Sequence, residues 1–94
     1  MSYELKFKHD ALKEWRKLDG SIREMLKTKL TKRLQQPRID SAQLREMSDC
    51  YKIKLRGSGY RLVYQVRDNE LVVIVIAVGK RDKNLVYKLA RNRL

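Results

Sequence analysis

The pattern of apolar and polar positions in residues 51–81 predicts three β-strands joined by two tight turns. The turns are Gly57-Ser58-Gly59 and Asp68-Asn69-Glu70. Because successive side chains of a strand point to opposite faces, parity gives the first two strands one apolar and one polar face. The apolar face takes Tyr51, Ile53, Leu55, Leu62, Tyr64 and Val66, and the polar face takes Lys52, Lys54, Arg56, Arg61, Val63, Gln65 and Arg67. The third strand, Leu71 to Val78, is apolar on both faces, which is typical of a covered central strand.

The residues before these strands change from a period of two to a helical period. Residues 3–7 alternate as a short first strand. From about Asp10 the pattern becomes helical, with one apolar stripe formed by Ala11, Leu12, Trp15 and Leu18. We expect Gly20 to end this helix in the left-handed backbone conformation that glycine tolerates.

A second helix is predicted to follow directly and to end before Pro37, because the residue before a proline is disfavoured in a helix. Ser21 and Glu24 have the spacing of a capping box at its start. Its apolar stripe consists of Ile22, Met25, Leu26, Leu30 and Leu34. We expect the two helices to form an αα-hairpin over one face of the sheet.

The remaining segments complete a single domain that spans residues 1–94. Residues 37–50 form a connector with two apolar anchors, Ile39 and Leu44, and a last helix carries Leu85, Val86, Leu89 and Leu94. The predicted fold is α+β, a small, mostly antiparallel sheet packed on an N-terminal αα-hairpin, in the order βααβββα.

Charge indicates a class of partner, because the chain has 23 Lys and Arg residues against 11 Asp and Glu residues, a net charge of +12. Such a surplus in 94 residues favours a phosphate-rich partner, above all nucleic acid. An anionic membrane is the weaker alternative, because the cations follow a strand pattern rather than one amphipathic helix. Like charges that face one another on a sheet are destabilising without an anion between them.

The lone cysteine predicts a reducing compartment, and we expect a cytoplasmic protein. Cys50 has no partner for an intramolecular disulfide, and we expect it to be a small buried residue. The sequence shows no signal-peptide pattern. Its longest apolar run, Leu71 to Val78, is far shorter than the roughly 20 residues that cross a bilayer as a helix. We therefore expect no membrane association.

Elimination narrows the chemistry that these residues can perform. His9 is the only histidine, which excludes a two-histidine ribonuclease mechanism. The carboxylates are too scattered to hold Mg²⁺, and the ligand count excludes zinc, so no metal or cofactor is expected. Lys, Arg and Tyr still suffice for attack of an RNA 2′-OH on its own phosphate. Fixed cations stabilise the developing charge, and a lysine among other cations loses its proton more readily.

Plainer interpretations of the same residues stay open. Alternating lysines on a strand are most often a solvated face. Tyr51, Tyr60 and Tyr64 are more often packing residues than platforms for bases, whereas the pattern leaves Tyr87 undecided between the two roles.

Taken together, these segments resemble the RelE toxins of bacterial and archaeal toxin–antitoxin modules, within the RelE/ParE superfamily. The similar segments are YKIKLRGSGYRLVYQV, VGKR and VY in the second half of the chain, and ALKEWRKL and IRE in the first. The resemblance covers nearly the whole chain in register. It implies a RelE-like, microbial-ribonuclease-like fold and an mRNA interferase. Such an endoribonuclease enters the empty ribosomal A site, cuts the mRNA codon there by 2′-OH attack without a metal, and so inhibits translation.

The resemblance also implies a catalytic set, Lys52, Lys54, Arg61, Arg81 and Tyr87. Lys54 resembles the general base, assisted by Lys52. Arg61 and Lys52 resemble the groups that hold the scissile phosphate. Arg81 resembles the acid or charge stabiliser at the leaving group, and Tyr87 the residue that stacks on or orients the substrate nucleotide.

Around this set, Arg45, Arg56 and Lys80 are expected to bind RNA or the ribosome. The implied partners are mRNA in the A site of the 70S ribosome, with contacts to rRNA, and a cognate RelB-like antitoxin. The antitoxin is expected to be acidic, partly disordered and folded on binding. Operator DNA would be bound only through the antitoxin complex.

Two other classes of function remain open. One is a gyrase-inhibiting toxin of the same superfamily, which does not need the Lys, Arg and Tyr set. The other is a non-enzymatic RNA- or ribosome-binding module, for which the positive charge alone suffices.

Overall fold

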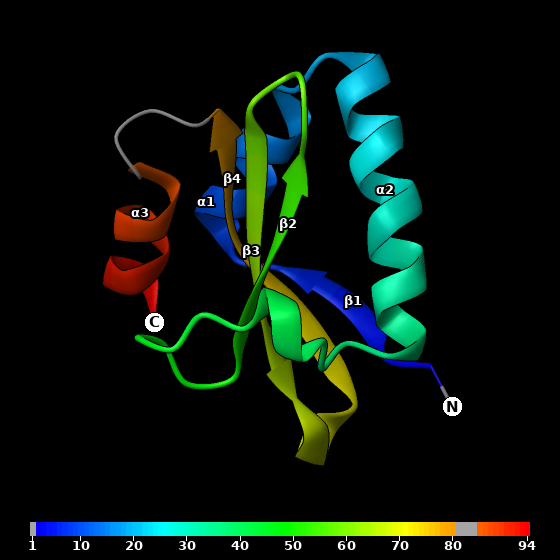
Figure 1. Ribbon diagram of the computed structural model, residues 1–94, viewed down its shortest axis with the longest axis vertical. Helices are drawn as coiled ribbons and strands as arrows, with labels where there is room; N and C mark the ends of the chain where they lie inside the picture. The colour runs from blue at the N-terminus through cyan, green and yellow to red at the C-terminus, as the bar shows by residue number, and fades with distance from the viewer. Residues whose placement is uncertain (1, 81–84) are drawn as a thin grey trace.

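The strands that the sequence pattern predicts are present in the structure. In the computed structural model, which describes residues 2–80 and 85–94, the strands form one sheet in the order β1-β4-β3-β2 (Figure 1). They are β1 (Glu4–Phe7), β2 (Cys50–Leu55), β3 (Tyr60–Arg67) and β4 (Val72–Lys80). β1 lies parallel to β4, and the other two pairings are antiparallel. The prediction of a small, mostly antiparallel sheet is confirmed.

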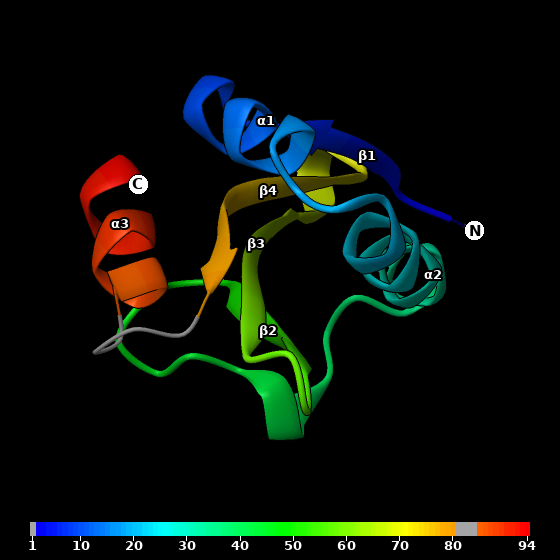
Figure 2. The same cartoon turned by 90° about the horizontal axis from the view of Figure 1, so that it is seen from above.

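Helices lie on both faces of this sheet (Figure 2). Within the described residues they are α1 (His9–Arg16), α2 (Gly20–Gln35) and α3 (Leu85–Arg93), with short 3₁₀ turns η1 (Asp40–Ala42) and η2 (Asp68–Glu70) in two of the connections. The order of helices and strands is therefore βααβββα, as predicted. α1 and α2 share one apolar cluster with the sheet, and α3 packs on the opposite face through another.

The cluster under α1 and α2 contains the apolar face predicted for β2 and β3. Its helix residues recur at helical spacing, and the fully buried Leu26 contributes roughly 1.5–3 kcal/mol by leaving water. Met25, which we expected on this stripe, is 46% exposed because it lies about 100° around the helix from Leu26. The main members of the cluster are Ala11, Leu18, Ile22, Leu26, Leu30, Tyr51, Ile53, Leu55, Leu62, Tyr64, Val66, Val73, Val75 and Val78.

The opposite face of the sheet is only partly polar, because α3 and the connector before β2 cover part of it. Val63 has the parity of the polar face, as predicted, yet it is fully buried in a cluster with Met47, Cys50, Ile76, Ala77, Val86 and Ala90. Cys50 is buried as expected, and this burial, with a smaller effect of Asp49, raises the pKa of its thiol to about 11. Leu85 and Leu94, predicted for the apolar stripe of the last helix, are each 49% exposed.

The junction between α1 and α2 differs from the prediction. Gly20 is the first residue of α2, and the described glycines with positive φ are Gly57 and Gly59. α1 instead ends in a tightened turn, in which the Leu18 N–H donates to the Trp15 carbonyl. The capping box is also wrong, because Asp19 occupies the N-cap and places Ser21 inside the first turn.

The two predicted turns between the strands are confirmed. Gly57 and Gly59 have φ values of 87° and 78°, and residues other than glycine rarely adopt such values. Residues 68–70 form η2, and Leu71 follows it in the left-handed region with a φ of 53°. β4 begins directly afterwards.

β4 contains a bulge, and two charged side chains form hydrogen bonds with backbone groups at the bulge and just after it. Val63 faces Ala77 and Tyr64 faces Val75, which leaves Ile76 as the extra residue. Pairing with β1 ends at Val75, so the edge of β4 beyond it needs other partners.

Glu14 and Arg93 supply these partners. The Val78 N–H donates to Glu14 Oε1 at 3.2 Å, and Arg93 Nη1 donates to the Ile76 carbonyl at 3.0 Å. The two side chains also form a salt bridge of 2.8 Å, with 17% of the arginine and 25% of the glutamate side chain exposed. α1, β4 and α3 are therefore tied together at one point.

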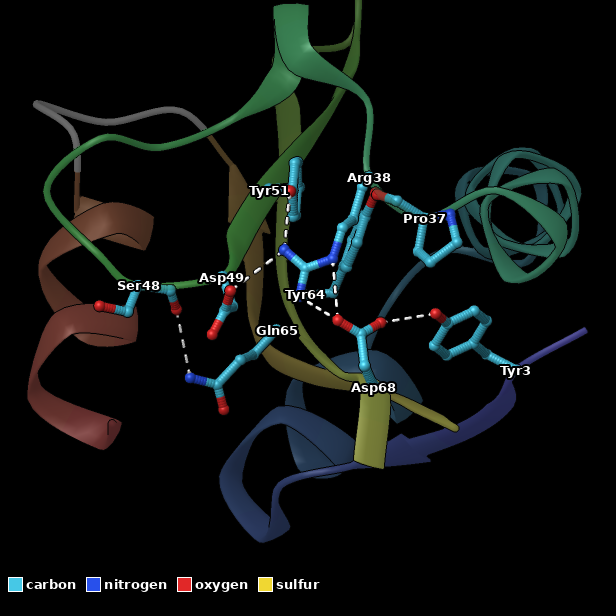
Figure 3. A network of polar contacts seen from close by, with 9 residues as sticks. All are labelled: Tyr3, Pro37, Arg38, Ser48, Asp49, Tyr51, Tyr64, Gln65 and Asp68. Atoms are coloured by element: carbon cyan, nitrogen blue, oxygen red, sulfur yellow. Dashed lines mark hydrogen bonds and ion pairs between the residues drawn. The ribbon is translucent and has the colours of Figure 1, made fainter. Parts of the chain in front are cut away.

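Arg38 joins three segments of the chain at the end of the sheet near η2 (Figure 3). It donates to Asp68 Oδ2 at 2.6 Å and to Asp49 Oδ1 at 3.0 Å, and to the Tyr51 hydroxyl at 3.2 Å. The Tyr3 hydroxyl donates to Asp68 Oδ1 at 2.6 Å. The hydrogen bond from Tyr3, followed by that from Arg38, holds the pKa of Asp68 below its usual range.

Replacing Asp68 with asparagine should lower the stability of the folded protein in a pH-dependent way. Because the pKa of Asp68 is lowered by folding, its contribution is complete above the unfolded value of about 3.9 and is lost as the pH falls through the folded value. The difference in urea midpoint between the wild type and Asp68→Asn should therefore be largest near neutrality and shrink in acid. Glu4→Gln, at an exposed position of β1, is the control. A difference that stays constant as the pH is lowered contradicts the expectation.

Candidate functional site

Three of the predicted site residues, Lys54, Arg61 and Tyr87, gather towards the end of the sheet near the Gly57–Gly59 turn, on the face that carries α3. Lys54 on β2 lies directly opposite Arg61 on β3, and Arg61 lies opposite Gly79 on β4. Two cations therefore face one another across the hairpin, which costs stability unless an anion lies between them.

Arg61 and Tyr87 connect the sheet to α3. Arg61 Nη1 donates to the Tyr87 hydroxyl at 2.9 Å, and the guanidinium carbon lies 5.8 Å from the centroid of the ring. Val86 and Ala90, buried against the sheet, hold the helix in place. Tyr87 is therefore anchored by its helix on one side and by Arg61 on the other.

Lys54, Arg56, Tyr60 and Arg61 line a hollow of about 280 Å³ at the glycine turn. Lys80 lies next to it, because it pairs with Tyr60 across the β3–β4 ladder and its Nζ lies 5.8 Å from the centroid of the Tyr60 ring. The hollow is thus cationic with an aromatic wall, a combination suited to a phosphate and a neighbouring ring.

The remaining predicted residues are placed less closely. Lys52 lies on β2 opposite Val63, two register pairs from Lys54 and farther from the glycine turn. Arg45 is exposed on the connector that precedes β2. Arg81 follows β4 directly in the sequence but lies outside the described residues.

The tyrosines of the strands take different roles. Tyr51 and Tyr64 are buried and stack on each other, with centroids 5.7 Å apart, so they are packing residues. Tyr64 also donates to the Pro37 carbonyl at 2.6 Å. Tyr60, by contrast, is half-buried in the cationic hollow.

A second cationic hollow contains two residues that the sequence analysis missed. Lys29 and Arg33 of α2 lie with Lys52, Lys54 and Arg56 around a groove of about 490 Å³ at the outer edge of β2. Arg33 Nη1 donates to the Tyr64 hydroxyl at 2.9 Å and to the Lys52 carbonyl at 3.3 Å. The signal available in the sequence was the spacing of four between Lys29 and Arg33, which places both on one side of a helix.

The described residues meet neither the requirements of a metal site nor those of a membrane-spanning helix. Within residues 2–80 and 85–94, no group of three or more His, Cys, Asp or Glu side chains could hold a metal ion. In the same part of the chain, no helix has the length and hydrophobicity needed to cross a bilayer.

Comparison with known proteins identifies the class of protein to which the chain belongs. Residues 5–85 match the family model described as "ParE toxin of type II toxin-antitoxin system, parDE". The chain, with its mixed sheet and cationic hairpin, therefore belongs to the toxins of type II toxin–antitoxin systems.

Relatives that match over the full length then identify the family within this class of toxins. The chain is 58% identical over 94 residues to the mRNA interferase toxin RelE of Escherichia coli K12, covering 100% of this chain and 99% of that protein. It is 55% identical, with the same coverage, to a putative RelE-like toxin protein of Escherichia coli. The chain belongs to the RelE family, as its motifs indicated.

Solved structures agree with this assignment. A double mutant of the E. coli toxin RelE in the free state superposes with a TM-score of 0.93 at 57% identity, covering 100% of this chain and 99% of that one. The toxin chain of the intact E. coli RelBE toxin–antitoxin complex gives a TM-score of 0.84 at 60% identity, covering 86% and 99%. The predicted fold is therefore confirmed by relatives as well as by the arrangement of its elements.

Proposed function

We propose that this protein is a toxin that cleaves messenger RNA on the ribosome and inhibits translation until an antitoxin binds it. The observation that carries the proposal is the full-length identity of 58% to an mRNA interferase. The cationic hollow and the contact between Arg61 and Tyr87 support it, because they offer a phosphate site and a ring at one place.

In the proposed reaction, Lys54, assisted by Lys52, removes the proton of a ribose 2′-OH, and the oxygen attacks the adjacent phosphorus. The bond from phosphorus to the 5′-oxygen of the next nucleotide breaks, which leaves a 2′,3′-cyclic phosphate. Arg61 and Lys52 stabilise the charge on the phosphate oxygens. Arg81 protonates or electrostatically stabilises the departing oxygen, and Tyr87 stacks on the nucleotide. No step uses a metal.

Dependence on the ribosome has a physical motive. A site that relies on Lys, Arg and Tyr side chains has little intrinsic power, and a ribosome that orders the mRNA lowers the barrier by positioning. Arg45, Arg56 and Lys80 are proposed to contact RNA, either the mRNA in the A site or the surrounding rRNA. The proposed place of action is accordingly the cytoplasm.

A RelB-like antitoxin is the proposed inhibitor. The E. coli relative has been crystallised as a RelBE toxin–antitoxin complex, and a net charge of +12 suits an acidic partner. Binding of operator DNA is proposed only for the complex with the antitoxin.

Primer extension on programmed ribosomes with an empty A site tests the function. The same mRNA without ribosomes, with and without EDTA, is the control. Cuts within the A-site codon that require ribosomes are expected. Folded protein that leaves the ribosome-bound mRNA intact contradicts the proposal.

Gyrase inhibition is the second candidate, because the matched family model carries the name of ParE rather than RelE. A supercoiling assay with purified gyrase distinguishes the two. Inhibition of supercoiling, together with intact ribosome-bound mRNA, favours this candidate.

A further inference from the structure

A pocket of about 410 Å³ lies between α3 and the connector that precedes β2, with Tyr87 in its wall. Its volume falls in the range of roughly 300–1,000 Å³ that is typical of small-ligand sites. The Tyr87 hydroxyl accepts the hydrogen bond from Arg61, which lines the cationic hollow. Tyr87 therefore links this pocket, through its hydrogen bond with Arg61, to the lining of the cationic hollow.

The inner wall of this pocket suits a flat ring. Met47 is 4% exposed and Leu44 is half-buried, and both pack in the cluster under α3. Together with Tyr87 they present an aromatic ring, a thioether and a branched aliphatic group. Aromatic side chains stack on nucleobases irrespective of the base, and thioethers adapt to aromatic edges.

The rim supplies hydrogen-bonding groups of both kinds. Arg91 and Glu46 form a salt bridge of 3.4 Å, with 51% and 74% of their side chains exposed. An exposed ion pair of this kind adds little to stability, so a ligand separates it at little cost. Once separated, the carboxylate of Glu46 only accepts hydrogen bonds and the guanidinium of Arg91 only donates them.

We propose that this pocket binds one of the two nucleobases that flank the cleaved bond, and that Glu46 selects it. The inference rests on the proposed function. The ring stacks between Tyr87 and the apolar wall, and the Glu46 carboxylate accepts an N–H from an exocyclic amino group. Adenine, cytosine and guanine carry such a group. Uracil has no exocyclic amino group, and its one donor on that edge, N3–H, lies between two carbonyl oxygens that a carboxylate repels, so the pocket disfavours uracil.

Cleavage rates on ribosomes whose A-site codons differ in one base test this inference. At one of the positions flanking the cut, the wild type should cleave codons with adenine, cytosine or guanine about fivefold faster than codons with uracil, the low end for a base contact because the rim is exposed. Glu46→Gln should bring this ratio close to one, because an amide both accepts and donates. Glu70→Gln is the matched control. It alters an exposed ion pair with Arg67 near η2 and should keep the wild-type ratio. An unchanged ratio in Glu46→Gln overturns the inference.

A readout without cleavage separates this inference from the proposed function. If the wild type leaves ribosome-bound mRNA intact, the proposed function fails, and the pocket is judged by the methyl resonance of Met47. Cytidine 5′-monophosphate should shift this resonance more than uridine 5′-monophosphate or inorganic phosphate, and Glu46→Gln should remove the difference. Equal effects of the two nucleotides on the wild type overturn the inference.

Discussion

Replacing Arg61 with alanine should lower the single-turnover rate of mRNA cleavage on the ribosome by about 10²-fold or more, the usual effect of removing one stabilising donor. Arg61 lies opposite Lys54 and donates a hydrogen bond to Tyr87. Its loss therefore removes both the proposed phosphate ligand and a support of the ring that is proposed to stack on the nucleotide. Tyr87→Phe keeps the ring but removes the bond to Arg61, and its effect should be about 2- to 10-fold, the range of one hydrogen bond. Ribosome affinity, measured separately, should change far less than the rate in both variants.

Arg67→Ala is the matched control for Arg61→Ala. Arg67 is on the same strand with the same parity, but it lies at the other end, where it contacts Gln65 and Glu70. In an enzyme, Arg67→Ala should leave the cleavage rate close to that of the wild type. Equal losses of ribosome affinity for the two variants, with cleavage falling only in proportion, would indicate a binding module.

Replacing Glu14 with alanine should lower the free energy of unfolding by about 2–3 kcal/mol, which lies between the value for one charged hydrogen bond and that for a broken buried ion pair. The change leaves the Arg93 guanidinium partly buried without its carboxylate and removes the acceptor of the Val78 N–H. Urea unfolding at neutral pH measures the total effect. Hydrogen exchange should show faster opening of α3 than of β3, because Arg93 lies in the last turn of that helix.

Two further variants isolate the ion pair as the source of that loss. Glu24→Ala changes an exposed glutamate of α2 and should stay within about 0.5 kcal/mol of the wild type. Arg93→Met added to Glu14→Ala removes the unpaired charge and should restore part of the stability. A double variant that is no more stable than Glu14→Ala alone contradicts this account.

Local patterns predicted the elements of this fold because its strands and helices follow their periods closely. The parity of residues 51–56 and 61–67 placed the apolar side chains of β2 and β3 on the correct face, and the structure joins the two strands in one register through the glycine turn. The same register brought Lys54 opposite Arg61. Tyr87 was left undecided because its role depends on how α3 packs, which a helical period does not specify.

Local sequence patterns could not predict contacts between residues that lie far apart in the sequence. Glu14 and Arg93 are 79 residues apart, and Arg38 and Asp68 are 30 apart, so no period relates them. The burial of Val63 was visible in part, because an apolar residue stood among polar ones of the same parity. The position of Gly20 was misjudged because glycine ends helices often, whereas here the last turn of α1 tightens and Asp19 precedes the next helix.

Neutralisation of Arg38 by Asp49 and Asp68 affects how the molecule moves near a polyanion. The η2 end holds carboxylates that offset its arginines, whereas lysines and arginines line the hollows towards the glycine turn, at the opposite end of the sheet (Figure 1). The β2–β3 hairpin is therefore more positively charged near its glycine turn than near η2. Near a surface of phosphates the field turns the molecule before contact, so that it arrives with the hairpin tip first and fewer encounters are misoriented. This orienting torque acts over about 8–10 Å at physiological salt and weakens as the ionic strength rises.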